Sequence, residues 1–509
     1  MAKVKSLKVV SVAAAAALAC TLASSASADE SKDFQVKRSL KGNMMEVYNV
    51  VPGKADSITD MFADGIVYGR LRVNSFNWDW KNDDTAETGN KDNRALGLGG
   101  SLIYKTASLH GLSAGAGLYY TDNPFPGERM PQQNIKYLKA GKDTVSRYNV
   151  STLGTYGFAS LAQLYVQYDI SKTSFVAGRQ IFESFLTKSN DTKMIPNTFE
   201  GYSFTTKEIP ATRIRGAWFY QQKLRDHETF HDVLTFKDGD GNSWNNNDDA
   251  AVHKGLSFQN LQAAGKDVSH SLIVADIQNK SIKNLQLDLT YGAVPGMISS
   301  LTGEVNYAIP VGGWTITPGA RYMYQMDDGA GKVGGACLSG SLAGQSGEQK
   351  GYKEADSLDS SLWMARLVAE TGPLKMQIAY SSVADEGDIV APWRGFPTGG
   401  YTRAMAQYNW RANTQTTAAE VKYDFGKAKL VSGLSAMVRY AMQDFDEDKQ
   451  AAGGQADSNI IHIDVIEKIK AIPGLEAKMR IGLVDAKDRE AGYDKDSYNE
   501  YRFEVNYLF

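Results

Sequence analysis

The chain has 509 residues, 42% of them hydrophobic, and its 55 basic and 58 acidic side chains leave a formal net charge of −3. This balanced charge offers no electrostatic footprint for nucleic acid, so we expect no nucleic-acid partner. Tyr (26) and Gly (48) are abundant while Pro (13) is scarce, which is typical of a membrane β-barrel with aromatic girdles, curved strands and few prolines inside its ladders.

The first residues have the pattern of a secretory signal peptide, which we predict to span residues 1–28. Three lysines precede an apolar run, and Ala26-Ser27-Ala28 supplies a small-residue cleavage site. The alternative is lipoprotein processing at Cys20. After cleavage before Asp29 only Cys337 remains, which excludes an intrachain disulfide.

Residues 29–64 show no regular alternation, and we predict that they form an N-terminal periplasmic extension. A short helix is expected over Ile58 to Phe62, and Pro52-Gly53 marks a turn. The segment would act as a plug or as a contact on the peptidoglycan side.

From Gly65 onwards apolar and polar residues alternate, as in a strand with one face in lipid and the other in water. Residues 65–509 therefore predict an all-β fold, a transmembrane antiparallel up-and-down β-barrel of about 18 strands, with sixteen as the alternative. Short periplasmic turns should alternate with long extracellular loops. In chain order the strands are predicted from 65 onwards and at 95–105, 112–121, 158–169, 173–180, 201–209, 212–223, 269–277, 282–292, 301–309, 314–326, 361–370, 374–382, 416–424, 434–442, 460–468, 475–484 and 498–509.

Nine arginines fall on the face opposite the apolar residues of their strands. On the lipid face each would cost about 2–4 kcal/mol at the bilayer midplane, so we place them in the lumen. A row of guanidinium groups offers an anion successive weak sites, because each planar fork matches a carboxylate. The alternative is structural pairing with lumenal acids such as Glu304, Glu420, Glu476 and Glu504. The predicted pore-lining set is Arg70, Arg72, Arg213, Arg215, Arg321, Arg366, Arg439, Arg480 and Arg502.

The loop from Ile181 to Glu200 is the candidate for a constriction. It carries Glu183, Asp191 and Lys193, and acids that face a basic wall create a transverse field selecting dipolar solutes. Arg394 and Arg403 lie in a second long loop, from Asp385 to Thr414, which either reaches the mouth of the pore or folds over its outer rim.

His227-Glu228-Thr229-Phe230-His231 fits the H-E-x-x-H pattern of zinc proteases. That chemistry needs a helix and a third ligand, whereas this segment follows a strand end without a metzincin continuation. We therefore interpret it as a loop, with an adventitious metal as the alternative.

Asp238, Asp240, Asn242 and Asp249 place oxygen ligands at the spacing of a calcium loop. The sixth position is Ser243, where an EF-hand needs glycine, and the last acid is not glutamate. A solvated, turn-forming loop is the competing interpretation.

The last strand, Tyr501 to Phe509, alternates strictly and ends in an aromatic residue, which resembles the assembly signal of outer-membrane barrels. By itself the segment also fits a half-buried edge strand of a soluble sheet. Five further segments, taken in order, resemble the OprD-type outer-membrane porin family, and among its members the epsilonproteobacterial ones most. They are Gly178-Arg179-Gln180 with Asn190 to Gly201 (the third-loop signature), Ala391 to Pro397 (an inward-folded loop), and Gly433 to Tyr440 with Pro473 to Arg480 (the last hairpins).

The resemblance covers about Gly65 to Phe509 and implies an eighteen-stranded selective channel with a lumenal ladder of basic residues. We predict a porin, not an enzyme, for passive selective diffusion of small anionic or zwitterionic solutes: carboxylates, amino acids and small peptides. The alternative is a general-diffusion surface protein whose extracellular loops act in adhesion or ligand binding.

Expected partners are small solutes, outer-membrane lipid and lipopolysaccharide, and the barrel-assembly machinery, which would recognise Phe509. No cofactor is expected, with calcium at the Asp238–Asp249 loop as the alternative. The protein would be a monomer or a homotrimer in the bacterial outer membrane.

Overall fold

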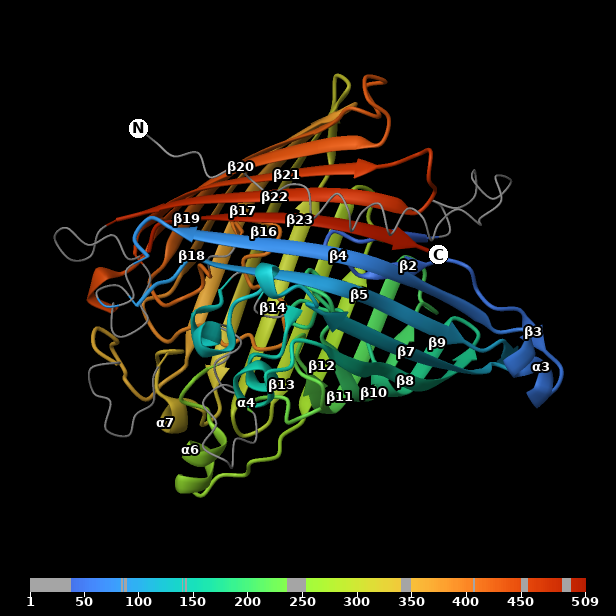
Figure 1. Cartoon of the computed structure of the whole chain (residues 1–509), viewed down its shortest axis with the longest axis horizontal. Helices are drawn as coiled ribbons and strands as arrows, with labels where there is room; N and C mark the ends of the chain where they lie inside the picture. Colours follow the sequence, from blue (N-terminus) through green and yellow to red (C-terminus); the bar gives the residue numbers. More distant parts are fainter. Residues whose placement is uncertain are drawn as a thin grey trace.

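The computed structural model describes residues 38–83, 86, 89–139, 141, 144–235, 253–339, 349–405, 408–449, 456–487 and 496–509. Within them, eighteen long antiparallel strands close into a barrel, each pairing with the next and β23 with β4 (Figure 1). They are β4 (Ile66–Trp80), β5 (Asn93–Lys105), β7 (Leu112–Asp122), β8 (Phe158–Ile170), β9 (Thr173–Gln180), β10 (Thr198–Thr206), β11 (Thr212–Lys223), β12 (Leu272–Asn279), β13 (Leu285–Val294), β14 (Ile298–Tyr307), β16 (Trp314–Asp327), β17 (Ser360–Thr371), β18 (Leu374–Val383), β19 (Gln415–Asp424), β20 (Leu434–Asp444), β21 (Ser458–Lys468), β22 (Leu475–Ala486) and β23 (Tyr498–Leu508).

The predicted barrel and strand number are confirmed. Alternation sets the strands because outward residues such as Leu71 and Trp218 are exposed, while their neighbours Arg72 and Phe219 are buried. No helix in the described part of the chain is long and apolar enough to cross a membrane. The predicted signal peptide (1–28) and calcium ligands (Asp238, Asp240, Asn242, Asp249) fall outside the described residues.

Four predicted strands begin three residues away from their predicted start: those expected at 201–209, 269–277, 282–292 and 301–309 are β10, β12, β13 and β14. The strand expected at 201–209 is β10, which begins three residues earlier because Phe199 turns inward and is buried. The strand expected at 269–277 begins at Leu272, because the backbone N–H of His270 donates to Asp232 Oδ2 (2.5 Å) in the preceding loop and not to a neighbouring strand.

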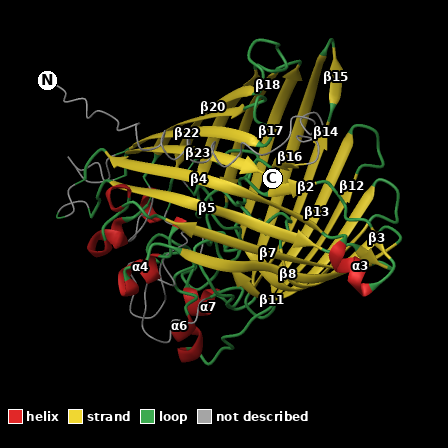
Figure 2. Cartoon of the chain, turned by 45° about the vertical axis from the view of Figure 1, so that its right-hand side comes forward, coloured by secondary structure: helices red, strands yellow, loops and turns green. Residues whose placement is uncertain are grey.

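Short turns join the strands at one end of the barrel and long loops at the other, with one exception at 295–297 between β13 and β14. The loop end carries the helices α4 (Arg147–Leu153), α6 (Phe258–Ala263) and α7 (Gly331–Gly334), whereas α3 (Ile58–Ala63) lies at the opposite end (Figure 2). The loops also contain the 3-10 turns η2 (Pro126–Glu128), η3 (Gln132–Tyr137) and η5 (Glu447–Lys449).

The barrel closes between the first and last long strands. The N–H of Gly69 donates to the carbonyl of Phe509 (3.2 Å), and the N–H of Phe509 donates back to the carbonyl of Gly69 (3.1 Å). A Cβ on Gly69 would lie 2.1 Å from the carbonyl oxygen of Ser101 in β5, so no larger residue fits at this seam.

The chain before β4 forms two small units. β3 (Lys54–Ala55) and α3 dock on the turn after β5, where the N–H of Ala107 donates to Met61 O (2.9 Å) next to β6 (Ser108–Leu109). α3 confirms the predicted short helix and is N-capped by Ser57. β1 (Arg38–Leu40) and β2 (Glu46–Tyr48) form a hairpin next to β4, while β15 (Ile309–Val311) extends β14.

Candidate functional site

The loop between β9 and β10 turns into the barrel and spreads over its inner wall. Met194 and Ile195 are fully buried against inward residues of β4, β5 and β7, such as Tyr68 and Tyr119. Residues 184–187 of the same loop lie against the inner faces of β12 and β14. The loop predicted as a constriction therefore lies in the lumen against strands that precede its own strands β9 and β10 (β4, β5 and β7) and against strands that follow them (β12 and β14).

Asp191, in the interior of this loop, lies in a buried network with two arginines of β4. Arg70 Nη2 lies 2.5 Å from Asp191 Oδ2, and Arg72 Nη1 lies 2.8 Å from Asp191 Oδ1. Arg72 also reaches Glu504 of β23 (2.6 Å), and Arg70 Nε lies 3.1 Å from Glu46 of β2. Two guanidinium groups thus face three carboxylates, all nearly inaccessible to solvent.

The other two predicted loop residues have different surroundings. Glu183 accepts from Ser189 Oγ (2.7 Å) and from Asn43 Nδ2 (2.6 Å), and Lys41 lies 3.6 Å away. Burial alone would raise the pKa of Glu183, but Lys188 and these partners hold it below its ordinary value. Lys193 is buried with its ammonium 4.2 Å from the centre of the Phe76 ring.

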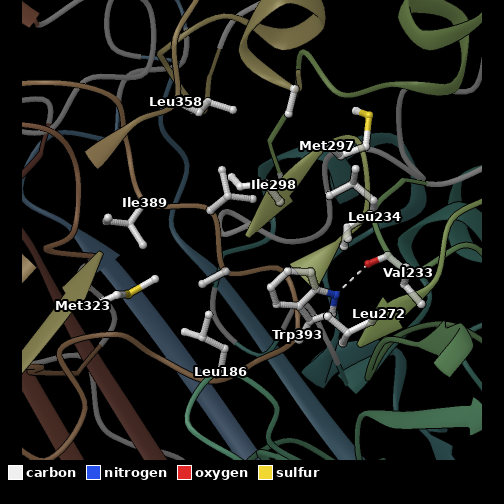
Figure 3. Packing of buried hydrophobic residues seen from close by; sticks show 14 of the residues in the cluster. Leu186, Val233, Leu234, Leu272, Met297, Ile298, Met323, Leu358, Ile389 and Trp393 are labelled. Carbon is white, nitrogen blue, oxygen red and sulfur yellow. Dashed lines mark hydrogen bonds between the residues drawn. The ribbon is translucent and has the colours of Figure 1, made fainter. Parts of the chain in front are cut away.

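The loop between β18 and β19 also folds inward. Thr187 and Arg394 form an isolated antiparallel bridge, and the N–H of Lys188 donates to the carbonyl of Trp393 (3.0 Å). Trp393 is buried and donates from Nε1 to the carbonyl of Val233 (2.8 Å) in a third loop (Figure 3).

These loops share one apolar cluster with the inner faces of the strands. In Figure 3, Leu186, Val233, Ile389 and Trp393 come from three different loops and pack around Leu272, Ile298 and Met323 of β12, β14 and β16. The segment around Trp393 therefore packs against the inner faces of the strands, in agreement with the inward-folded loop that the resemblance implied, and the alternative of a fold over the outer rim does not hold for this segment.

Glu304 of β14 joins two of the predicted arginines on the opposite side of the lumen. Its Oε2 lies 2.6 Å from Arg321 Nη2, and its Oε1 lies 3.2 Å from Arg366 Nη2. Backbone carbonyls of the β18–β19 loop hold both guanidinium groups, with Arg321 donating to Pro397 (3.1 Å) and Arg366 to Gly400 (2.9 Å). The ring of Tyr401 contacts both guanidinium groups, with its centre 4.6 Å from the guanidinium carbon of Arg321 and 4.5 Å from that of Arg366.

Four more predicted arginines pair with acids on the same or the next strand. The pairs are Arg215–Asp276 (2.5 Å), Arg480–Asp464 (3.1 Å), Arg502–Glu500 (2.6 Å) and Arg439–Glu420. Among the described residues Arg213 makes no ion pair, and its cross-strand neighbour is Gln278. Arg403, in the β18–β19 loop, lies 4.9 Å from the ring centre of Phe396, and burial lowers its pKa to about 10.

The polar wall therefore runs from β14 through β23 to β4 as alternating charges. Glu304 and Glu420 were predicted as lumenal acids, whereas Asp276, Asp464 and Glu500 were not. No acid was assigned to a particular arginine, although the pairs follow from strand register. Glu304 is directly opposite Arg321, Glu420 opposite Arg439 and Asp464 opposite Arg480. A register fixed by the short turns would have revealed these pairs.

The H-E-x-x-H segment has no helix. His227 Nδ1 and His231 Nε2 lie 2.9 Å apart, and His231 Nδ1 donates to the carbonyl of Asp232 (2.8 Å) beside a cavity of about 720 Å³. No group of three or more His, Cys, Asp or Glu among the described residues could hold a metal ion. The geometry thus gives no support to a zinc-protease site at these residues.

Comparison with known proteins places this architecture among characterised channels. Residues 150–509 match the model of a family described as outer membrane porin, OprD family. The fold is similar to Acinetobacter baumannii OccAB1 (TM-score 0.66, 14% identity, 90% of this chain and 99% of that chain). It is also similar to Pseudomonas aeruginosa OccK9 (OpdG; 0.65, 16%, 88% and 99%) and to P. aeruginosa OpdK solved with vanillate (0.62, 14%, 88% and 99%). No curated protein sequence matches.

Proposed function

Because the chain belongs to the OprD family of outer membrane porins, we propose that it passes small anionic or zwitterionic solutes by passive, selective diffusion along the charged wall of its barrel. Carboxylates, amino acids and small peptides are the solute classes that fit. Kinship with the epsilonproteobacterial members of the family remains a prediction.

The observation that carries the proposal is the group formed by Arg321, Arg366 and Glu304. Side chains of Arg366 and Arg321 keep 20% and 10% of their surface open, so a solute carboxylate can reach them, whereas the Arg70 and Arg72 side chains are closed off. Two guanidinium groups share one carboxylate, which leaves one positive charge unbalanced for an anion.

Neighbouring pairs on β20 to β23 carry both signs, and a solute with an ammonium group as well as a carboxylate can interact with both. Weak successive sites of this kind favour passage over retention. Vanillate, with which OpdK was solved, is itself a small carboxylate, and this agrees with the proposed solute class. The nine predicted arginines, together with Glu183, Asp191 and Lys193, are thus proposed to shape the path.

The test is single-channel recording in planar bilayers across a salt gradient, with a panel of carboxylates and amino acids as blockers. Arg366→Gln should weaken block by carboxylates roughly tenfold, because it removes one charged hydrogen-bond donor. The matched control is Arg129→Gln, since Arg129 stacks on Tyr156 in the β7–β8 loop (4.0 Å) away from the wall. Large, unselective and unblocked conductance would instead favour the general-diffusion alternative.

We further propose that Phe509, at the closing seam, is recognised by the barrel-assembly machinery. Deleting it should lower the amount of folded barrel in outer membranes, measured as heat-modifiable protein. Cross-linking in native membranes would separate monomer from homotrimer.

A further inference from the structure

We propose that the N-terminal hairpin, residues Arg38–Tyr48, is a second constriction element that narrows the pore and sets its charge preference. This inference rests on the proposed channel function and adds to it a part of the chain that precedes the barrel. It assigns a role to a segment that lies outside the matched family region of residues 150–509.

The hairpin lies inside the barrel. Met44, at its turn, is 2% exposed; its carbonyl accepts from Arg70 Nη1 (3.0 Å) and its sulfur lies 3.8 Å from Lys478 Nζ. Arg70 and Lys478 belong to β4 and β22, and the residues that follow them, Leu71 and Met479, are exposed on the outer face. Since successive residues of a strand face opposite sides, Met44 touches the inner wall.

A second anchor fixes the direction of the hairpin. Glu46 accepts from Ser101 Oγ of β5, and Tyr48 stacks on Tyr68 of β4 with ring centres 4.5 Å apart and planes 8° from parallel. These contacts tie β2 to the wall over several residues, so the hairpin is held in one place.

The tip of the hairpin also reaches the constriction loop. Asn43 Nδ2 donates to Glu183 Oε1 (2.6 Å) and to Ser189 Oγ (3.4 Å), and Lys41 Nζ lies 3.6 Å from Glu183 Oε2. The hairpin therefore bridges the β4 wall and the β9–β10 loop, and it occupies cross-section between them that would otherwise be open to solutes.

Glu46 also changes the local charge. Without the hairpin, Arg70 and Arg72 would be balanced by Asp191 and Glu504; with Glu46 the same two guanidinium groups face three carboxylates. Glu46 thus adds one negative charge to a network that also interacts with Lys478. The cations of the hairpin lie elsewhere, Arg38 beside Tyr48 and Lys41 beside Glu183. The added negative charge disfavours anions at this point of the path.

The experiment compares three full-length proteins in planar bilayers. In the first, residues 38–48 are replaced by a Gly/Ser segment of equal length; the second is Glu46→Gln, and the third is Asp60→Asn, which removes one carboxylate from α3 outside the lumen. Heat-modifiable mobility confirms that each barrel is folded, and Glu46→Gln keeps the test decisive if the replaced segment prevents folding.

We expect the segment replacement to raise single-channel conductance about twofold. Glu46→Gln should raise anion over cation permeability about threefold, as one unit charge about 7 Å from the ion in water predicts at a Debye length of about 10 Å. Asp60→Asn should match wild type. Wild-type values in both lumenal variants would overturn the inference while leaving the proposed function intact.

If wild type does not conduct and the segment-replaced protein does, the hairpin closes the pore completely. That outcome would refute the partial constriction proposed here, while the barrel itself would still be a channel. If neither conducts, both the inference and the proposed function fail.

Discussion

Replacing Glu304 by glutamine is expected to raise the anion-to-cation permeability ratio of the channel about fivefold. Glu304 is the carboxylate shared by Arg321 and Arg366, so the substitution changes the charge of the group from +1 to +2. A unit charge about 5 Å from a passing ion in water changes its energy by about 0.8 kcal/mol. In 0.1 M salt, where the Debye length is about 10 Å, screening reduces this to about 0.5 kcal/mol. The anion is favoured and the cation disfavoured by about 2.3-fold each, so the ratio of the two permeabilities changes about fivefold.

The two arginines should stay in place in this variant. Arg321 also donates to the carbonyls of Pro397 (3.1 Å) and Gly399 (3.0 Å), and Arg366 donates to Gly400 (2.9 Å) and to Asn306 Oδ1 (2.6 Å). The glutamine oxygen remains an acceptor of similar size. The effect should therefore be one of charge and not of a rearranged wall.

The assay is the reversal potential across a tenfold KCl gradient. The matched control is Glu208→Gln, because Glu208 is an exposed carboxylate at the turn end that accepts from Lys172 N (2.7 Å). A reversal potential equal to that of wild type in the folded, conducting Glu304→Gln protein would refute the reasoning. An equal shift in the control would refute it as well, since it would show an unspecific effect of surface charge.

Three further outcomes are expected. Trp393→Ala should loosen the β18–β19 loop by about 3–5 kcal/mol, seen as faster protease cleavage within residues 384–414, because it empties a buried site; an unchanged rate contradicts this. Asp191→Asn should lower the thermal midpoint of the folded barrel, since Arg70 and Arg72 lose a buried partner at a cost of about 3–5 kcal/mol; a midpoint equal to that of wild type would argue that the network contributes nothing. Burial lowers the pKa of His253 to about 4 from about 6.5 in the undocked loop, where the imidazole takes up a proton more readily. The packing of residues 253–261 against the rest of the protein should therefore be most stable above pH 6.5 and lose about 3 kcal/mol as the pH falls toward 4, which hydrogen exchange at these residues measures. His253→Gln should abolish this pH dependence, and a dependence that persists in this variant would refute the assignment to His253.

Alternation predicted the barrel because a wall between lipid and water imposes a period of two on every strand. The same alternation predicted that the arginines face the lumen, because exposed residues such as Leu71 and Trp218 identify the outer face of β4 and β11. Their partners were not predicted individually, because a pair such as Glu304–Arg321 depends on strand register, which parity alone leaves open.

The lumenal segments could be predicted only in part. The β9–β10 loop was expected as a constriction from its charged residues, and a resemblance indicated that residues 391–397, which include Trp393, fold inward. Nothing periodic marks Ile389 as buried, and its only signal is a large apolar side chain within a long loop. The hairpin at 38–48 was harder still, because its contacts with Arg70 and Glu183 are tertiary and its two strands span three residues each.

The pairing of β4 with β23 also determines how late in synthesis and folding the barrel can close. Arg72 and Glu504 are 432 positions apart, so the ion pair between them cannot form until nearly the whole chain has been synthesised and delivered. Contacts of such long sequence separation are slow to form, and exposed strand edges in the meantime invite aggregation. The chain must therefore be kept unfolded and protected from aggregation until its C-terminal residues reach the membrane. Truncation near Phe509 should lower the amount of folded protein before it changes the transport of solutes.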